Sequence, residues 1–241
     1  MRSPHSLRAP PLRAVFLDAG GTLMREIPSR AEIYAGAALA RGRNVPAPAM
    51  RELMYRTNDE MPRSLDGHFR YSQGWFRVFI ERIFGGRLGL GTREVRDVQE
   101  ELLARFADPA TFALQPGAGE LLGFLRERGL AVGVISNWGE PLAGILRGLG
   151  IGESLDFVLA SAVERCEKPE PEIFARALAL ARVEPAEAVH AGDDPRKDVQ
   201  GPRALGILPV LVAAQDSESL PGVERVRDLE ELQRWIEARL G

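Results

Sequence analysis

Four short segments that each follow a predicted strand constrain the fold of this 241-residue chain more than any other feature. Short apolar runs that end in turn-forming or polar residues are typical of strands buried in a parallel sheet. Ligands of open α/β sheets bind outside the carboxyl ends of the strands, so we expect the four polar segments to meet in one crevice. These segments are residues 18–23 (Asp-Ala-Gly-Gly-Thr-Leu), Ser136-Asn137, Lys168-Pro169, and Gly192-Asp193-Asp194 with Asp198 beyond.

The first apolar run is followed by a long region with no pattern of buried strands. Residues 14–17 predict a strand that ends at Asp18, and Gly20-Gly21 permit a tight turn directly after it. Beyond this turn, apolar side chains recur at the spacing of helices. The predicted helices cover residues 30–41, 46–58, 71–84 and 92–107. Several helices between the first strand and the rest of the chain indicate an inserted helical subdomain.

After Pro116-Gly117 the pattern changes to an alternation of helices and strands. Strands are predicted at residues 131–135, 157–160, 188–191 and 208–212, and helices at 120–128, 141–149, 170–181, 202–205 and 229–240. This alternation favours a parallel sheet with right-handed crossovers. We therefore predict an α/β fold, a doubly wound parallel sheet. Its Rossmann-like core comprises residues 13–27 and 113–241, with a helical cap at residues 28–112 and a disordered tail at residues 1–12.

Composition and charge exclude several classes of protein. A net charge of -3 argues against a nucleic-acid binder, because such proteins are usually basic. No stretch approaches the ~20 apolar residues that a membrane span requires, and residues 1–12 lack the apolar segment of a signal peptide. Cys166 is the only cysteine, which excludes an intrachain disulfide. We expect a cytoplasmic monomer or homodimer that binds a small molecule.

The basic residues single out one lysine. Lys168 and Lys197 are the only lysines among the 31 basic residues, and Lys168 stands beside a proline at the start of a predicted helix. The helix dipole disfavours a cation at that position, so a function is the better interpretation. Asp193, Asp194 and Asp198 would repel one another unless a cation were bound, although a solvated loop is the alternative. His190, in the strand before them, is expected to be a strand residue whose imidazole has a hydrogen-bond partner.

These motifs resemble those of the haloacid dehalogenase-like hydrolase superfamily, in the branch with a helical cap inserted just after the first motif. The resemblance implies that Asp18 is a nucleophile whose carboxylate attacks phosphorus and forms an aspartyl-phosphate, which water then hydrolyses. It implies that Thr22, Ser136 and the adjacent Asn137 bind the phosphoryl group. It also implies that Lys168 contacts the phosphate and offsets the charge of the transition state.

The same resemblance implies a Mg²⁺ site. Its ligands would be Asp18, the backbone carbonyl of Gly20, Asp193 and Asp198, which are oxygen donors of the kind that Mg²⁺ prefers. Whether Asp194 also contacts the metal stays open. The implied activity is Mg²⁺-dependent hydrolysis of a small phosphorylated metabolite, that is, a phosphatase.

The chain departs from the family pattern at Gly20. Most phosphatases of this family carry there a second Asp, which acts as general acid and base, and such catalysis contributes roughly 10² to 10⁴ in rate. Haloacid dehalogenases also lack this Asp, but they use no metal, and the acidic fourth motif would then have no purpose. Phosphonate-cleaving relatives need a cap lysine, and residues 28–112 contain none. A catalytically weak protein that binds phosphate and Mg²⁺ is the third alternative.

The predicted cap offers four candidates for substrate contact, namely Arg63, His68, Arg70 and Trp75. His68 is also the candidate to replace the missing general acid, because the unperturbed histidine pKa of ~6.5 suits proton donation near neutrality.

Overall fold

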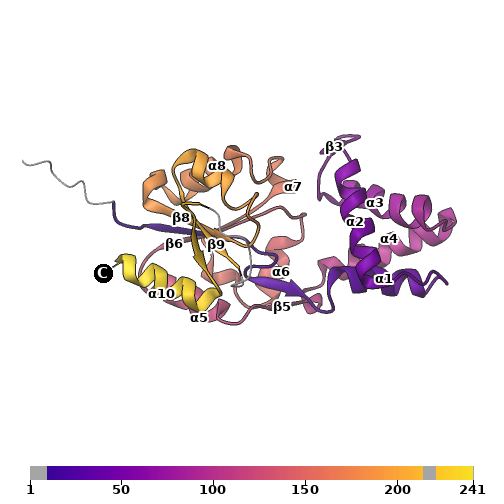
Figure 1. Cartoon of the computed structure of the whole chain (residues 1–241), viewed down its shortest axis with the longest axis horizontal. Helices are drawn as coiled ribbons and strands as arrows, with labels where there is room; N and C mark the ends of the chain where they lie inside the picture. The colour runs from indigo at the N-terminus through magenta and orange to yellow at the C-terminus, as the bar shows by residue number, and fades with distance from the viewer. Residues whose placement is uncertain (1–9, 214–220, 241) are drawn as a thin grey trace, which may run out of the picture.

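The fold is built on a six-stranded parallel sheet. The computed structural model describes residues 10–213 and 221–240. In this part of the chain the strand order is β10-β9-β8-β1-β6-β7, and helices cover both faces of the sheet (Figure 1). The strands are β1 (Ala14–Leu17), β6 (Ala131–Ser136), β7 (Phe157–Ala160), β8 (Ala188–Gly192), β9 (Leu208–Val212) and β10 (Glu224–Val226). The predicted α/β class and doubly wound parallel sheet are therefore confirmed.

Alternate residues of the central strand β1 pack against the two helical layers. Val15 and Leu17 belong to a hydrophobic cluster with residues of α5, α6 and α10, whereas Ala14 and Phe16 belong to a second cluster with residues of α8. Successive side chains of a strand point to opposite faces, so a strand covered on both faces must be apolar throughout. The helices are α5 (Ala118–Glu127), α6 (Leu142–Gly148), α7 (Ser161–Glu164), α8 (Pro171–Ala181), α9 (Gln200–Leu205) and α10 (Leu229–Leu240).

The chain leaves the sheet region and returns to it through a two-stranded ribbon. Strands β2 (Met24–Glu26) and β5 (Phe112–Leu114) pair antiparallel, with Met24 opposite Leu114. We call residues 27–111 the helical insert. Figure 1 places its helices to one side of the sheet, at the end of this ribbon. They are α1 (Arg30–Leu39), α2 (Ala47–Glu60), α3 (Gln73–Glu81) and α4 (Thr92–Ala107), with a hairpin of β3 (Ser64–Leu65) and β4 (His68–Phe69).

Aromatic side chains hold the helical insert together. Tyr34 is fully buried, and its ring lies 6.2 Å from Phe79, 5.9 Å from Phe84 and 6.0 Å from Phe106. Trp75 stacks on Phe79 at 5.6 Å. Each buried ring removes a large apolar area from water, so these rings stabilise the packing of the insert helices against one another.

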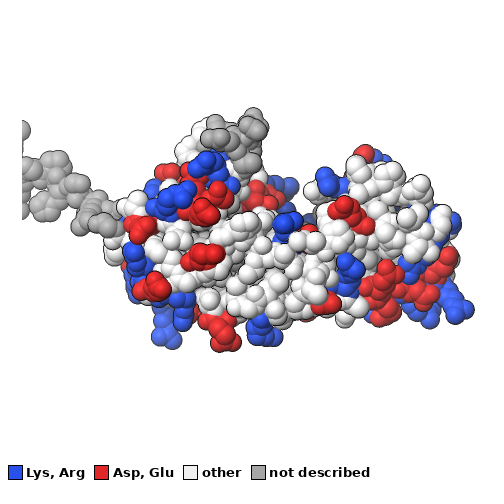
Figure 2. Space-filling view, turned by 90° about the horizontal axis from the view of Figure 1, so that it is seen from below, with Lys and Arg blue, Asp and Glu red and all other residues white. Residues whose placement is uncertain are grey.

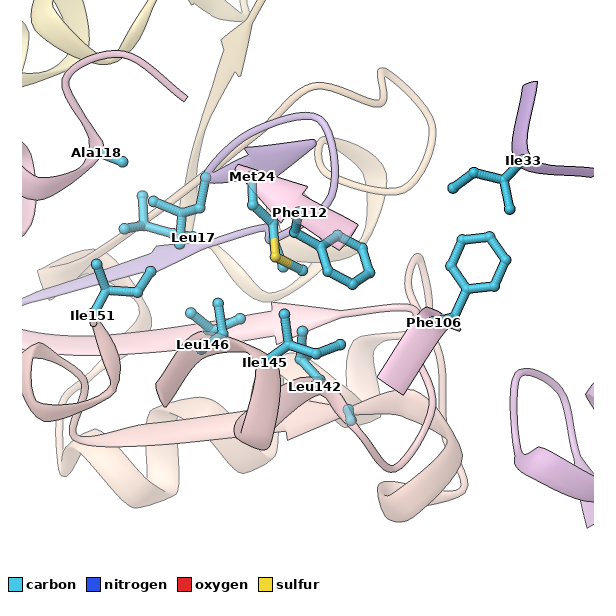
Figure 3. Packing of buried hydrophobic residues seen from close by; sticks show 14 of the residues in the cluster. Leu17, Met24, Ile33, Phe106, Phe112, Ala118, Leu142, Ile145, Leu146 and Ile151 are labelled. Carbon is cyan, nitrogen blue, oxygen red and sulfur yellow. The ribbon is translucent and has the colours of Figure 1, made fainter. Parts of the chain in front are cut away.

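The ribbon packs on the sheet region through its apolar side chains. In Figure 3, Met24 and Phe112 lie beside each other above the helix that carries Leu142 and Ile145. Met24 is fully buried and Phe112 is 6% exposed, and both belong to one continuous cluster with these α6 residues. The insert is thus tied to the sheet region by hydrophobic contact as well as by the two chain crossings.

Several short elements were not predicted, and one predicted helix is interrupted. Residues 71–84 form α3 and then a π-helical turn, η1 (Arg82–Arg87), while Ser72 caps α3 by accepting a hydrogen bond from Trp75 N at 3.4 Å. Tyr71 precedes this cap with a φ of 67°, which no helix accommodates. The predicted tail at residues 1–12 lies mostly outside the described residues.

Two surface properties bear on possible partners. In the described ranges, no helix is both long and apolar enough to cross a membrane. On the face shown in Figure 2, Lys and Arg side chains are interspersed with Asp and Glu side chains, with no continuous region of one sign among the described residues of that face.

Candidate active site

A buried lysine joins two carboxylates at the carboxyl end of the sheet. Lys168 Nζ lies 2.7 Å from Asp18 Oδ1 and 2.6 Å from Asp198 Oδ1, and the lysine is only 2% exposed. Asp18 follows β1, and Asp198 lies beyond β8, which is the neighbour of β1 in the sheet. Burial alone would lower the pKa of Lys168, but Asp18 and Asp198 outweigh it and hold that pKa above its usual range. The two carboxylates therefore favour the charged form of the lysine.

Asp198 is a buried anchor for this lysine. Its Oδ1 also lies 2.9 Å from His190 Nε2, and its Oδ2 accepts a hydrogen bond from Asp194 N at 3.0 Å. Burial alone would raise the pKa of Asp198, yet the charge of Lys168 and the hydrogen bond of His190 hold it well below its ordinary value. Gly192 makes this packing possible, because a Cβ there would lie 2.2 Å from Asp198 Cγ.

The predicted role of His190 as a strand residue agrees with its position. His190 is fully buried in β8, and burial lowers its pKa despite the nearby Asp198. A carboxylate only accepts hydrogen bonds, so the neutral imidazole carries its hydrogen on Nε2. Its Nδ1 has no hydrogen-bond partner among the described residues.

Asn137 fixes the backbone of Lys168. Its Nδ2 donates to Lys168 O at 2.9 Å, and its Oδ1 accepts from Lys168 N at 2.8 Å. The amide predicted to bind substrate is thus largely committed to holding the loop of Lys168. Ser136, the residue before it, is 3% exposed and lines the crevice together with Asp18.

The loop after Asp18 is a tight turn that meets the acidic segment. Gly21 has a φ of 88°, and a Cβ at this residue would lie 2.3 Å from Asp193 Oδ2, so only glycine fits. Thr22 is 1% exposed and donates to Asp193 Oδ1 at 3.3 Å. The two predicted motifs are therefore in direct contact, although they lie 171 positions apart.

Three carboxylates converge beside the lysine. Asp18, Asp193 and Asp198 each offer an oxygen, and these oxygens lie within 4.8 Å of one another. Partial burial of the Asp193 carboxylate, together with the charges of Asp18 and Asp198, raises the pKa of Asp193 to about 7. Lys168 offsets part of this negative charge. The arrangement favours a further cation with a preference for oxygen ligands.

Asp194 stabilises the acidic loop itself. Its Oδ1 accepts from Arg196 N at 2.9 Å and Lys197 N at 3.0 Å, and its Oδ2 accepts from Lys197 Nζ at 2.7 Å. This is the pattern of an Asp that caps a turn. Asp194, for which the sequence left a metal contact open, therefore already accepts three hydrogen bonds through its carboxylate.

A crevice of about 680 Å³ lies above these residues, between the sheet and the helical insert. Asp18, Ser136, Lys168 and Asp193 line its floor, and residues of α1, α2 and α3 line its walls. The four predicted motifs therefore meet in one crevice, as the ends of parallel strands require.

Comparisons with known proteins agree with this geometry. Residues 12–206 match the family model of haloacid dehalogenase-like hydrolases. This chain belongs to that family. It is 36% identical over 205 residues to human haloacid dehalogenase-like hydrolase domain-containing protein 3, covering 83% of this chain and 82% of the human one. It is 31% identical over 247 residues to a phosphoserine phosphatase of Thermus thermophilus, covering 92% and 98%.

A solved structure shows the same fold. The L-2-haloacid dehalogenase RSc1362 superposes on this hydrolase with a TM-score of 0.70, covering 95% of this chain and all of the other. The two sequences are 22% identical, so this similarity establishes the fold and leaves the choice of substrate open.

The predicted cap candidates divide into two pairs in the hydrolase. Arg70 and Trp75 line the crevice, whereas Arg63 and His68 are not among its lining residues. Arg63 forms a two-pronged ion pair with Glu170. His68 is exposed in the hairpin, and its ring covers Gly74, where a Cβ would lie 2.4 Å from its Nδ1. The structure gives no support to His68 as a proton donor.

Polar contacts close the insert of the hydrolase over the crevice. Arg70 lies 3.8 Å from Glu167, the residue before Lys168, and Glu140 accepts from Gln73 N at 3.1 Å. Burial raises the pKa of Glu167 despite its arginine neighbours. The described conformation is thus one in which the insert touches the loop that carries the lysine.

Sequence reasoning missed Trp138 and Arg30, which both line the crevice. The guanidinium of Arg30 lies 5.1 Å from the centre of the Trp138 ring, within the range of a cation–π contact. Trp138 directly follows the motif Ser136-Asn137, and this neighbourhood was the signal that could have identified it. Arg30 carried no such signal, because arginine is common throughout the chain.

Proposed function

We propose that this hydrolase is a Mg²⁺-dependent phosphatase that removes the phosphoryl group from a small metabolite. The observation that carries the proposal is the buried Lys168, which lies between Asp18 and Asp198 on the floor of the crevice. A cation beside Asp18 is what a carboxylate needs in order to approach a phosphate dianion. The similarity to a phosphoserine phosphatase supports the same reaction class.

The proposed reaction has two displacements at phosphorus. A carboxylate oxygen of Asp18 forms a bond to phosphorus while the bond to the leaving oxygen breaks, and that oxygen departs with the electron pair. Water then attacks phosphorus, releases inorganic phosphate and restores the Asp18 carboxylate. Lys168 stays protonated throughout and offsets the charge on the phosphoryl oxygens. Ser136 and Thr22 hold the group and the loop beneath it.

The residues present fit a Mg²⁺ ion. Asp18 and Asp193 would bind it together with the predicted carbonyl of Gly20, and a bound Mg²⁺ would neutralise charge on the phosphate. Asp198 already accepts hydrogen bonds from Lys168, His190 and Asp194 N, which leaves it little free capacity. We propose that Asp198 positions Lys168 first and contributes to the metal site second. The raised pKa of Asp193 reflects desolvation and then the negative charges of Asp18 and Asp198, which the ion would balance.

Two other functions are compatible with a glycine at residue 20. A 2-haloacid dehalogenase would need no proton donor, but it would leave the cluster of Asp18, Asp193 and Asp198 unexplained. A weak binding protein would retain phosphate and metal without turnover.

The insert over the crevice favours a small substrate and a closure step that excludes water. The cytoplasmic location and the monomeric or homodimeric state stay predictions of the sequence.

The test is a screen of the purified protein against phosphorylated metabolites and 2-haloacids, with Mg²⁺ and with EDTA. We expect phosphate release that requires Mg²⁺ and that is lost in Asp18→Asn, because an amide is a poor nucleophile. Halide release in EDTA would establish the dehalogenase instead. Binding of Mg²⁺ and phosphate without release of either product would establish the binding protein.

A further inference from the structure

The indole of Trp138 leaves no room for a side chain at residue 20. Gly20 is not among the glycines with positive φ, so its backbone conformation is open to any residue. What excludes a side chain is space: a Cβ at residue 20 would lie 2.8 Å from Cζ3 of the Trp138 indole. An aspartate at this position would have to displace the ring.

The ring of Trp138 is held from several sides. Arg30 lies 5.1 Å from its centre on one side, and Phe112 contacts it with ring centres 5.7 Å apart. Arg30 is itself fixed by Glu26, which accepts from its Nε at 2.9 Å. The backbone of Trp138 is anchored as well, since its carbonyl accepts from Ala162 N at 3.1 Å. A ring packed in this way cannot move without losing contacts in both the ribbon and α1.

Trp138 also forms a wall shared by two cavities. One is the crevice over Asp18, and the other is a neighbouring pocket of about 250 Å³ between α3, α4 and the segment 137–141. The indole therefore lines the same crevice as Asp18, and its carbon atoms lie where a side chain on residue 20 would project.

We propose that Trp138 selects the leaving group, by excluding a carboxyl group from residue 20 and placing an apolar ring in its position. The proposal rests on the proposed phosphatase activity. With no acid at residue 20, the bond between phosphorus and the leaving oxygen breaks without proton transfer from that residue, and the oxygen departs as an anion. Aryl and acyl phosphates, whose oxygens are stable anions, are then cleaved far better than alkyl phosphates.

The activity test compares Gly20→Asp, Trp138→Ala and the double variant with the wild type. The readout is the ratio of kcat/KM for an alkyl phosphate to that for 4-nitrophenyl phosphate, which cancels general losses of activity. Gly20→Asp alone should not raise this ratio. The double variant should raise it at least 10-fold over Trp138→Ala, toward the roughly 10² to 10⁴ of a general acid, and should flatten the dependence on leaving-group pKa.

Two results would overturn the proposal. The first is an equal rise of the ratio in Gly20→Asp and in the double variant, since the ring would then exclude nothing. The second is a double variant that is folded by circular dichroism and cleaves 4-nitrophenyl phosphate, yet has the ratio of Trp138→Ala. If the wild type cleaves no phosphate ester with Mg²⁺, the proposed function and the selection of leaving groups fail together, and the steric claim is decided separately.

The clash between residue 20 and the indole is tested separately, by thermal unfolding alone. Gly20→Ala should lower the Tm by about 2 to 12 °C in the wild-type background, because overpacking costs roughly 1 to 3 kcal/mol. In the Trp138→Ala background the same change should lower it little or raise it. Gly144→Ala, in α6, is the matched control, because a Cβ there meets no atom within 4 Å. Equal losses in both backgrounds would refute the clash between residue 20 and the indole.

Discussion

The replacement Lys168→Met tests the charge arrangement at the centre of the site. Methionine approximates the length and volume of lysine but removes the cation, so Asp18 and Asp198 are left facing each other in a buried environment. Removing one partner of a buried ion pair costs roughly 3 to 5 kcal/mol, because the remaining charge is uncompensated. A loss of this size corresponds to about 6 to 20 °C in Tm for a protein of this length.

The stability that Lys168→Met loses should increase as the pH rises. In the wild type the pKa of Asp198 is depressed, so its contribution to stability is present above its unfolded pKa of ~3.9 and is lost as the pH falls below that value. In Lys168→Met the burial of Asp198 is no longer opposed by the lysine charge, so we expect that pKa to rise while His190 and Asp194 N keep their hydrogen bonds. A raised carboxyl pKa costs stability as the pH rises above ~3.9. The deficit should therefore be larger at pH 8 than at pH 5.

The chain contains a matched control. Lys197 is the only other lysine, and it forms an ion pair with Asp194 at 2.7 Å, but its side chain is 41% exposed. Exposed pairs contribute about 1 kcal/mol or less, so Lys197→Met should cost far less. The assay is urea unfolding of both variants and the wild type at pH 5 and pH 8, without Mg²⁺. Equal losses in the two variants, or a Lys168→Met deficit that does not grow with pH, would refute the reasoning.

The remaining predictions concern the metal and the lysine loop. Mg²⁺ binding, measured by calorimetry in buffers of different ionisation enthalpy, should release about one proton at pH 6 and almost none at pH 8.5, because the pKa of Asp193 is about 7 without metal. Asp193→Asn should remove both the proton release and the rise in Tm caused by Mg²⁺; a full rise in Tm in this variant would exclude Asp193 as a ligand. Asn137→Ala should lower kcat roughly 10- to 100-fold while the fold is retained, because two hydrogen bonds that place Lys168 are lost. An unchanged kcat would show that Lys168 keeps its position without them.

The long elements could be predicted because their patterns are redundant. The helix at residues 92–107 and the strands at residues 157–160 and 208–212 have the predicted bounds. The strands β2, β5 and β10 were missed because each has three residues, too few to display a period of two. Their existence depends on pairing with distant strands, which no local pattern records.

The site was predictable in its residues and less so in its contacts. Asp18 directly follows an apolar run and Asp193 lies one residue beyond another, whereas Lys168 was singled out because lysine is rare in this chain. Trp138 was missed, since an indole above a glycine is a property of three-dimensional packing. His68 was singled out for its pKa range, and the hairpin that carries it turns it onto Gly74 instead.

The ribbon of β2 and β5 has a consequence for how such a protein can evolve. It brings the two ends of the helical insert side by side, through two strands of three residues each. The ribbon closes through its own strand pairing, so another segment could replace residues 27–111 provided that it buried the same apolar side chains of the sheet region. The groups to which we assign phosphoryl transfer lie almost entirely on one side of this junction, and residues of α1, α2 and α3 line the walls of the crevice on the other. Reaction chemistry and substrate preference can thus be inherited and exchanged as separate parts.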